Sequence, residues 1–286
     1  MNQSLKRFLP APLRSDAVVI PVVRLQGTIA TGGGPMRQNL SLSAVAGLLD
    51  KAFSYSAPAV AIAVNSPGGS PVQARLIYKR IRDLAQEKKK SVLIFVEDVA
   101  ASGGYMIAVA GDEIIADPSS IVGSIGVVSA GFGFQDMIKK IGVERRLYTS
   151  GRNKAILDPF QPEKQEDIDR LKKLQEEVHQ GFIGLVKERR GSKLADDDDL
   201  FTGLFWTGER GRDLGLVDHI GDMRGYLKSR FGPKTRMKLV SQPRGLFGRP
   251  LGFFGSETRS TEIASAAATG LIEALEEQAL WKRYGL

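Results

Sequence analysis

The chain has 286 residues, of which 42% are hydrophobic and 25% are charged, a composition typical of a globular protein with a sizeable core. It contains no cysteine, which excludes disulfides, thiolate nucleophiles and cysteine-ligated zinc. The two histidines, His179 and His219, lie in stretches where a surface or packing role is expected. A hydrolytic base in this chain is therefore expected to be another residue type.

The net charge of +8 is distributed unevenly. Residues 223–256 contain basic residues and several phenylalanines but no acidic residue. This pattern suits contact with an anionic membrane surface, and a solvated tail is the alternative interpretation. No recognised nucleic-acid motif accompanies the charge, so we do not expect nucleic acid as a partner.

No apolar run reaches the ~18 residues that span a bilayer, and residues 1–10 lack the apolar core of a secretory signal peptide. We therefore expect a cytoplasmic protein, with peripheral contact at the inner face of the cell membrane through residues 223–256 as an option.

The hydrophobic pattern predicts strands and helices in alternation. The expected strands are 17–25, 58–64, 91–97, 113–116, 126–128 and 144–149. The expected helices are 41–54, 71–89, a short one after Ser102, 134–141, 162–190 and 262–284. Because the strands are almost wholly apolar, we expect an α/β fold with a mainly parallel sheet covered by helices. The carboxylates of residues 196–199 are consecutive and point in different directions, which favours a solvated loop over a metal site.

Ser102 stands between two alanines and two glycines, where the apolar strand 91–97 passes into the short helix. Small neighbours leave the hydroxyl uncovered, and a helix N-terminus favours developing negative charge. These features indicate a nucleophile. A helix N-cap serine on a tight turn is the alternative interpretation.

The stretch VNSPGGS, residues 64–70, also lies between a buried strand and a helix. An oxyanion hole needs two fixed N–H groups near the carbonyl under attack. Gly68 or Gly69 would supply one of them and Gly103 the other. No Gly-Lys-Ser/Thr sequence follows, so this is not a phosphate loop, and a plain turn remains the alternative.

Several ordered stretches together resemble the signal peptide peptidase A family of serine peptidases, within the Clp protease/crotonase superfamily. The matching stretches are Asn65–Gly69, Ala101–Tyr105, Gly123–Val127, Ser150–Lys154, Phe205–Gly208 and Leu214–Asp218. The resemblance covers about residues 17–230 and implies the fold of that superfamily. The chain would then divide into an N-terminal tail (1–16), a peptidase domain (17–230) and a basic aromatic segment with a C-terminal amphipathic helix (231–286). Many members begin with a membrane anchor or export signal, and none is recognisable here.

The resemblance implies a Ser/Lys dyad with no cofactor, in which Ser102 is the nucleophile and Lys154 the general base. Ser124 falls where a hydroxyl helps to orient the lysine amine, although a turn serine is an equal interpretation. A lysine acts as a base only when neutral, which burial favours. A carboxylate beside the amine would favour its charged form, so we expect Asp158 to point away from the amine.

The resemblance also implies homo-oligomers whose subunits together form grooves for hydrophobic peptides, such as remnant signal peptides. Two other functions remain open. One is a crotonase-type enzyme that acts on an acyl thioester and binds coenzyme A. The other is a catalytically idle scaffold associated with membrane proteins.

Overall fold

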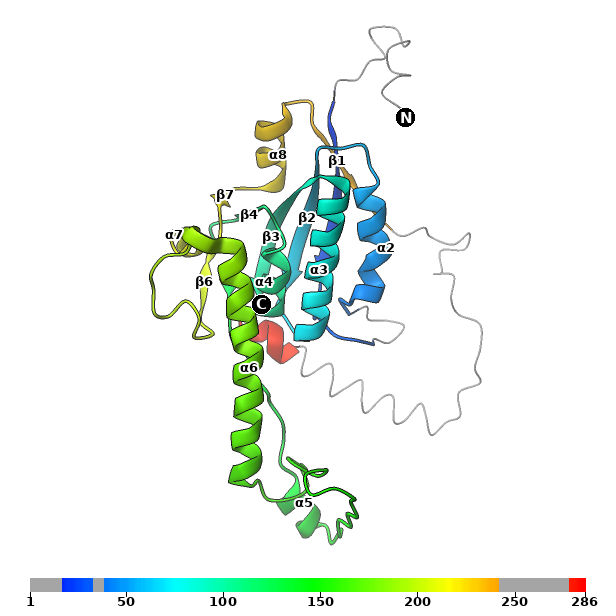
Figure 1. Ribbon diagram of the computed structural model, residues 1–286, viewed down its shortest axis with the longest axis vertical. Coiled ribbons are helices and arrows are strands. Elements are labelled where there is room, and N and C mark those ends of the chain that lie inside the picture. Colours follow the sequence, from blue (N-terminus) through cyan, green and yellow to red (C-terminus); the bar gives the residue numbers. More distant parts are fainter. Residues whose placement is uncertain (1–16, 33–38, 242–277) are drawn as a thin grey trace, which may run out of the picture.

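The computed structural model describes residues 17–32, 39–241 and 278–286 (Figure 1). Within these residues eight strands form one sheet. They are β1 (Val19–Gln26), β2 (Ala59–Ser66), β3 (Ser91–Ala101), β4 (Glu113–Ala116), β5 (Ile121–Gly123), β6 (Phe205–Thr207), β7 (His219–Ile220) and β8 (Arg236–Leu239). The main path runs β6-β5-β3-β2-β1-β8, and β4 joins β3 to β7. All of these pairs are parallel except β5 with β6, which confirms the predicted α/β fold with a mainly parallel sheet.

Helices cover both faces of this sheet. The described helices are α2 (Leu42–Phe53), α3 (Pro71–Lys88), α4 (Gly103–Ala108), α5 (Gln135–Lys140), α6 (Gln165–Arg190), α7 (Gly208–Asp213) and α8 (Met223–Phe231), with a 3₁₀ turn at Gly191–Lys193. Successive side chains of a strand point to opposite faces. One set of strand residues accordingly packs under α2, α3 and α4, and the alternate set packs under α8.

The strand β3 brings the candidate site together. Its first half pairs with β4 and its second half with β5, while its register against β2 shifts between Val64 and Ser66. At this irregularity the Asn65 side-chain amide donates to Asp98 over 2.6 Å, and its oxygen accepts from the Val99 N–H over 3.3 Å. Since β2 and β3 are parallel neighbours, the turns that follow them meet at one edge of the sheet.

The helix α6 carries part of the chain away from the sheet (Figure 1). Its buried side chains, Phe182, Val186 and Arg190, all lie in its last third. Its other end holds the segment that contains α5, where Phe132, Ile141 and Tyr148 are well exposed. We call residues 129–178 the arm.

Two predicted strands are wrong. Residues 126–128 have no regular structure, because the chain leaves β5 at Ser124, whose φ is 52°, and the Gly126 N–H turns back to the Ser124 carbonyl. Residues 144–149 also have none, because they lie on the arm, where none of the described strands pairs with them.

The sheet extends beyond the boundary predicted at residue 230. The strand β8 was not expected, and it pairs with β1 from Val19↔Arg236 to Val22↔Leu239. Within the basic residues 223–256, Arg230 pairs with Glu113, and the Lys238 ammonium lies 5.4 Å from the ring centroid of Tyr55. These charges are used within the fold.

The remaining predictions for this part of the chain fall partly outside the described residues. These are the tail 1–16, residues 242–256 of the basic segment and residues 262–277 of the last predicted helix. That helix is present over 278–282. None of the described helices combines the length and apolar character needed to cross a bilayer. Residues 196–199 lie in a loop, where Asp197 pairs with Arg210 over 3.2 Å.

Candidate active site

Ser102 occupies a strained turn at the end of β3. Its φ of 52° and ψ of −122° place a non-glycine residue in a sparsely populated backbone region, which costs about 1–3 kcal/mol. The turn is fixed from both sides, because the Ser102 N–H donates to Gly123 and the Ser102 carbonyl accepts from Met106. The side chain makes no capping hydrogen bond to α4. The hydroxyl is therefore not used as a helix cap, which was the alternative interpretation of this serine.

The turn after β2 packs directly against Ser102. A Cβ atom on Gly68 would lie 2.8 Å from the Cβ of Ser102, so only glycine allows this approach. The Gly68 N–H donates to the Ser66 hydroxyl over 3.3 Å. The next residue, Gly69, has a φ of 134°, and its nitrogen lies 3.5 Å from the position of a Cβ on Gly103. The fold thus brings the three predicted glycines together around the serine.

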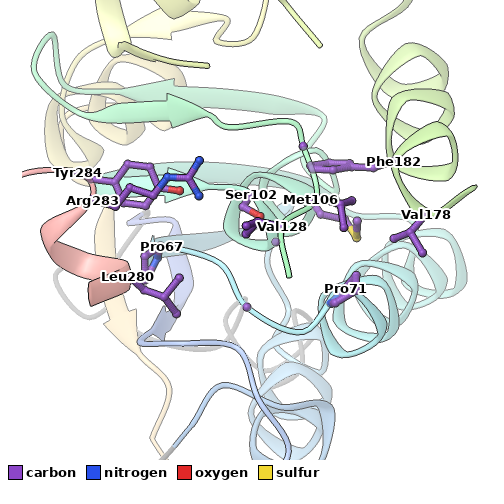
Figure 2. A pocket seen from close by; sticks show the side chains of 14 residues that line it. Pro67, Pro71, Ser102, Met106, Val128, Val178, Phe182, Leu280, Arg283 and Tyr284 are labelled. Atoms are coloured by element: carbon purple, nitrogen blue, oxygen red, sulfur yellow. The ribbon is translucent and has the colours of Figure 1, made fainter. Parts of the chain in front are cut away.

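A cavity of about 220 Å³ opens beside Ser102 (Figure 2). The backbones of Gly69 and Gly103 line it, and Gly68 does not. Most of the side chains around it are apolar: Pro67, Pro71, Met106, Val127, Val128, Val178, Phe182 and Leu280. A cavity with this lining accepts an apolar side chain next to a serine hydroxyl.

Ser124 is buried behind this cavity and bonded to a residue that the sequence did not indicate. The Tyr284 hydroxyl donates to the Ser124 hydroxyl over 3.2 Å. Tyr284 is 8% exposed, and its ring meets that of Phe205 edge-on at 5.0 Å. Leu280, Arg283 and Tyr284 all line the cavity. The sequence showed that the last helix has an apolar side but did not show what that side contacts.

His179 contacts the segment that forms one wall of the cavity. Its Nε2 lies 2.9 Å from the Ile125 carbonyl oxygen, to which it donates. Ile125 precedes Gly126, Val127 and Val128, which line the cavity. His179 therefore ties α6 to the wall of the cavity and takes a packing role, as expected.

Lys154 lies on the arm and is not among the residues that line the cavity. It is exposed. Its segment is anchored to the first turn of α6, where the Leu157 N–H donates to Asp167 over 3.4 Å. Phe182, at the cavity, is fifteen residues further along that helix, or about 22 Å at the helical rise of 1.5 Å per residue. Within one chain, the structure does not bring Lys154 to Ser102.

Asp158 is held apart from the lysine, as expected. Its carboxylate lies 3.2 Å from Arg145 and also accepts from the Phe160 N–H over 3.0 Å. Both carboxylate oxygens therefore have partners other than the Lys154 amine.

Tyr105 and Asp218, two ionisable groups with little exposure, have structural roles. Burial raises the pKa of Tyr105, whose hydroxyl donates to the Leu216 carbonyl over 2.9 Å, so this phenol stays neutral. Asp218 receives two bonds from Arg190, at 2.7 and 3.1 Å. Burial raises the pKa of Asp218, but hydrogen bonds from Arg190 and Lys193 outweigh it and hold that pKa below its usual value. Neither group lines the cavity.

Comparison with known proteins is consistent with this geometry. Residues 84–230, about half of the chain, match the sequence model of peptidase family S49. This chain belongs to peptidase family S49. The match includes Ser102, Ser124 and Lys154.

Relatives carry two kinds of name. A putative protease of Methanocaldococcus jannaschii is 34% identical over 68% of this chain and 63% of its own length. The chloroplastic serine protease SPPA of Arabidopsis thaliana is 30% identical over 71% of this chain and 31% of its own length. The Na(+)/H(+) antiporter NhaA of Brucella abortus is 62% identical over 99% of this chain, which spans only 39% of that protein.

The antiporter name belongs to a longer protein, of which this chain covers 39%. The part that is shared contains the residues that match the S49 model. Family membership supports a protease function for this chain.

Proposed function

We propose that this chain is a serine endopeptidase in which Ser102 is the nucleophile and Lys154 the general base. Its substrates are hydrophobic peptides, such as remnant signal peptides. The observation that carries the proposal is the strained Ser102 turn, whose hydroxyl stands beside an apolar cavity and two backbone N–H groups. A serine held on a sharp strand-to-helix turn is a recurrent arrangement for an exposed nucleophile.

The oxyanion hole in this proposal consists of the N–H groups of Gly69 and Gly103. Both residues line the cavity with Ser102. Gly68 lies outside the cavity and directs its N–H to Ser66, so its role is to let the turn approach the serine. Loss of one such donor typically lowers the rate by about 10²–10³.

The base comes from a second copy of the chain. An exposed lysine is protonated at neutral pH, so a lysine base requires burial. The arm carries exposed apolar side chains, including Phe132, Ile141 and Tyr148, which are 70%, 66% and 90% exposed. A homo-oligomer that covers these side chains with a neighbour's cavity face would bury Lys154 beside the neighbour's Ser102.

The catalytic cycle then follows from the placement of these groups. Neutral Lys154 removes the proton from the Ser102 hydroxyl, and the serine oxygen attacks the peptide carbonyl carbon. The N–H groups of Gly69 and Gly103 bind the oxyanion that forms. The Lys154 ammonium gives its proton to the leaving amine. Water, deprotonated by the same amine, then hydrolyses the acyl-enzyme.

Fluorophosphonate labelling with peptide mapping tests the dyad. Wild type should give one adduct, on Ser102, and both Ser102→Ala and Lys154→Ala should abolish it. Lys164→Ala, which removes another exposed arm lysine, is the matched control and should label normally. No adduct on a folded, oligomeric wild type would contradict the peptidase proposal and favour the idle scaffold. Protection from unfolding by coenzyme A would favour the crotonase-type alternative.

Mixed oligomers test the origin of the base. Ser102→Ala subunits keep Lys154, and Lys154→Ala subunits keep Ser102. If the base acts between copies, co-refolding the two inactive variants should restore labelling on the Lys154→Ala subunits. Oligomers that contain both variants but do not label would place the lysine within the same chain.

A further inference from the structure

One side of the candidate active site is closed by residues from far along the chain. Residues 278–282 form a short helix, a turn follows, and Leu280, Arg283 and Tyr284 reach the cavity beside Ser102 (Figure 2). Figure 1 shows the same segment, in red, below α4. We call residues 278–286 the strap.

Aromatic side chains hold the strap in place. Tyr284 is buried, donates to the Ser124 hydroxyl over 3.2 Å and packs edge-on against Phe205. Trp281 packs against the small cluster formed by Val99, Ala101 and Tyr284, at the end of β3. These contacts bury side chains at the carboxyl edge of the sheet, where Ser102 also lies.

Among the residues that the structure describes, few contacts hold the strap. Helices much shorter than ~12 residues are not stable without tertiary contacts, and the helix at 278–282 is far shorter than this. Gln278, Ala279, Lys282 and Arg283 are exposed. A segment held by a few side chains opens locally at low cost compared with unfolding the sheet.

We propose that the strap is an intramolecular blocker of the candidate active site, which must move before a hydrophobic peptide reaches Ser102. This proposal rests on the proposed peptidase function and adds its regulation. Leu280 and Tyr284 form part of the wall of the apolar cavity in which a substrate side chain would bind, and so limit its size. The Tyr284 hydroxyl also donates a hydrogen bond to the hydroxyl of Ser124, the group expected to orient the amine of Lys154. The strap therefore narrows the space for a substrate and takes up the hydroxyl that would orient the base.

Access to position 102 can be measured without any catalysis. Because the chain has no cysteine, Ser102→Cys introduces a single thiol. Its reaction rate with iodoacetamide reports access, and measurement at two pH values separates access from a change in thiolate fraction. Tyr284→Phe should raise this rate about threefold to tenfold, the effect of one neutral hydrogen bond. Deletion of 278–286 should raise it at least as much.

Two controls make the measurement decisive. Lys282→Ala changes an exposed strap residue that does not line the cavity, and it should leave the rate unchanged. A synthetic peptide with the sequence of residues 278–286 should slow the reaction of the deletion variant again. If the deletion variant loses its circular dichroism signal, Tyr284→Phe, which keeps every carbon contact, decides the question.

Unchanged or slower thiol reaction in a folded Tyr284→Phe variant would overturn the blocker and make the strap a structural part of the site. Fluorophosphonate labelling of the corresponding Ser102 proteins separates this result from the peptidase proposal. Faster thiol reaction without any fluorophosphonate adduct would support the strap and contradict the serine mechanism. An adduct on Ser102 that forms equally fast with and without the strap would support the serine mechanism and contradict the blocker.

Discussion

The contact between Gly68 and Ser102 gives the sharpest test of the site geometry. Gly68 has a φ of 107°, and a Cβ atom there would lie 2.8 Å from the Ser102 Cβ and 3.0 Å from both the Ala101 oxygen and the Gly103 nitrogen. Two of these three atoms belong to the backbone, so no change of rotamer relieves the contact. Gly68→Ala must therefore move the turn after β2 away from Ser102.

The expected cost has two parts. Positive φ in an alanine costs about 1–2 kcal/mol. Overcrowding in a packed region adds about 1–3 kcal/mol. Gly32→Ala is the matched control, because Gly32 has a φ of 90° but a Cβ there would meet nothing within 4 Å. Gly68→Ala should thus lower the free energy of unfolding by about 2–5 kcal/mol, and Gly32→Ala by about 1–2 kcal/mol.

Urea unfolding followed by circular dichroism measures both costs, and fluorophosphonate labelling measures the effect on Ser102. Misplacement of a catalytic group by about 1 Å lowers rates by about 10², so labelling of folded Gly68→Ala should fall by a factor of this order. Gly32→Ala should label like wild type. Equal destabilisation by the two alanines, with normal labelling of both, would refute the packing argument.

Three further changes test other parts of the fold. Asp218→Asn should lower the free energy of unfolding by about 3 kcal/mol at pH 7, because it leaves the buried Arg190 without its carboxylate. Burial raises the pKa of Asp218, but hydrogen bonds from Arg190 and Lys193 outweigh it and lower that pKa in the fold. The stability that the ion pair contributes is therefore present above about pH 4 and is lost as the pH falls. The free energies of unfolding of variant and wild type should converge in acid, and a constant difference down to about pH 2 would contradict the ion pair. His179→Leu should cost about 1–3 kcal/mol in urea unfolding by leaving the Ile125 carbonyl unpaired, and His179→Gln, which can still donate, should cost less; equal costs would argue against that hydrogen bond. Gly181→Ala, at an exposed position of α6 where a Cβ meets nothing, should raise stability by about 0.5–1 kcal/mol, and a lower melting temperature would show that this end of the helix is strained.

The buried centre of the sheet could be predicted because its residues carry a strong signal. Every residue of β2 is buried, and so are most residues of β3. Parallel strands covered on both faces appear in the sequence as continuous apolar runs. The turn at Ser102 could also be predicted, because the small residues around it allow backbones to approach closely and this requirement is visible in a short stretch of sequence.

The edges of the sheet could not be predicted in this way. The strand β8 has four residues that alternate between polar and apolar, so it is not a continuous apolar run and has the shortest alternation that indicates a strand. Val127 and Val128 have the composition of a strand, yet the chain turns at Ser124 before reaching them. Whether a short apolar run pairs depends on a free sheet edge, and sequence pattern does not contain that information.

The location of Lys154 shows the same limit for the site itself. Leu157, three residues later, is tied to Asp167, which is about 22 Å along α6 from Phe182. Residues 152–157 form turns on the arm, and Lys154 is exposed and does not line the cavity. Each residue of the proposed dyad lies in its own short motif, but in the proposal the two meet only across a surface that one chain leaves exposed. That is why the mixed-oligomer experiment, rather than either single variant, decides whether the motifs belong to one active site.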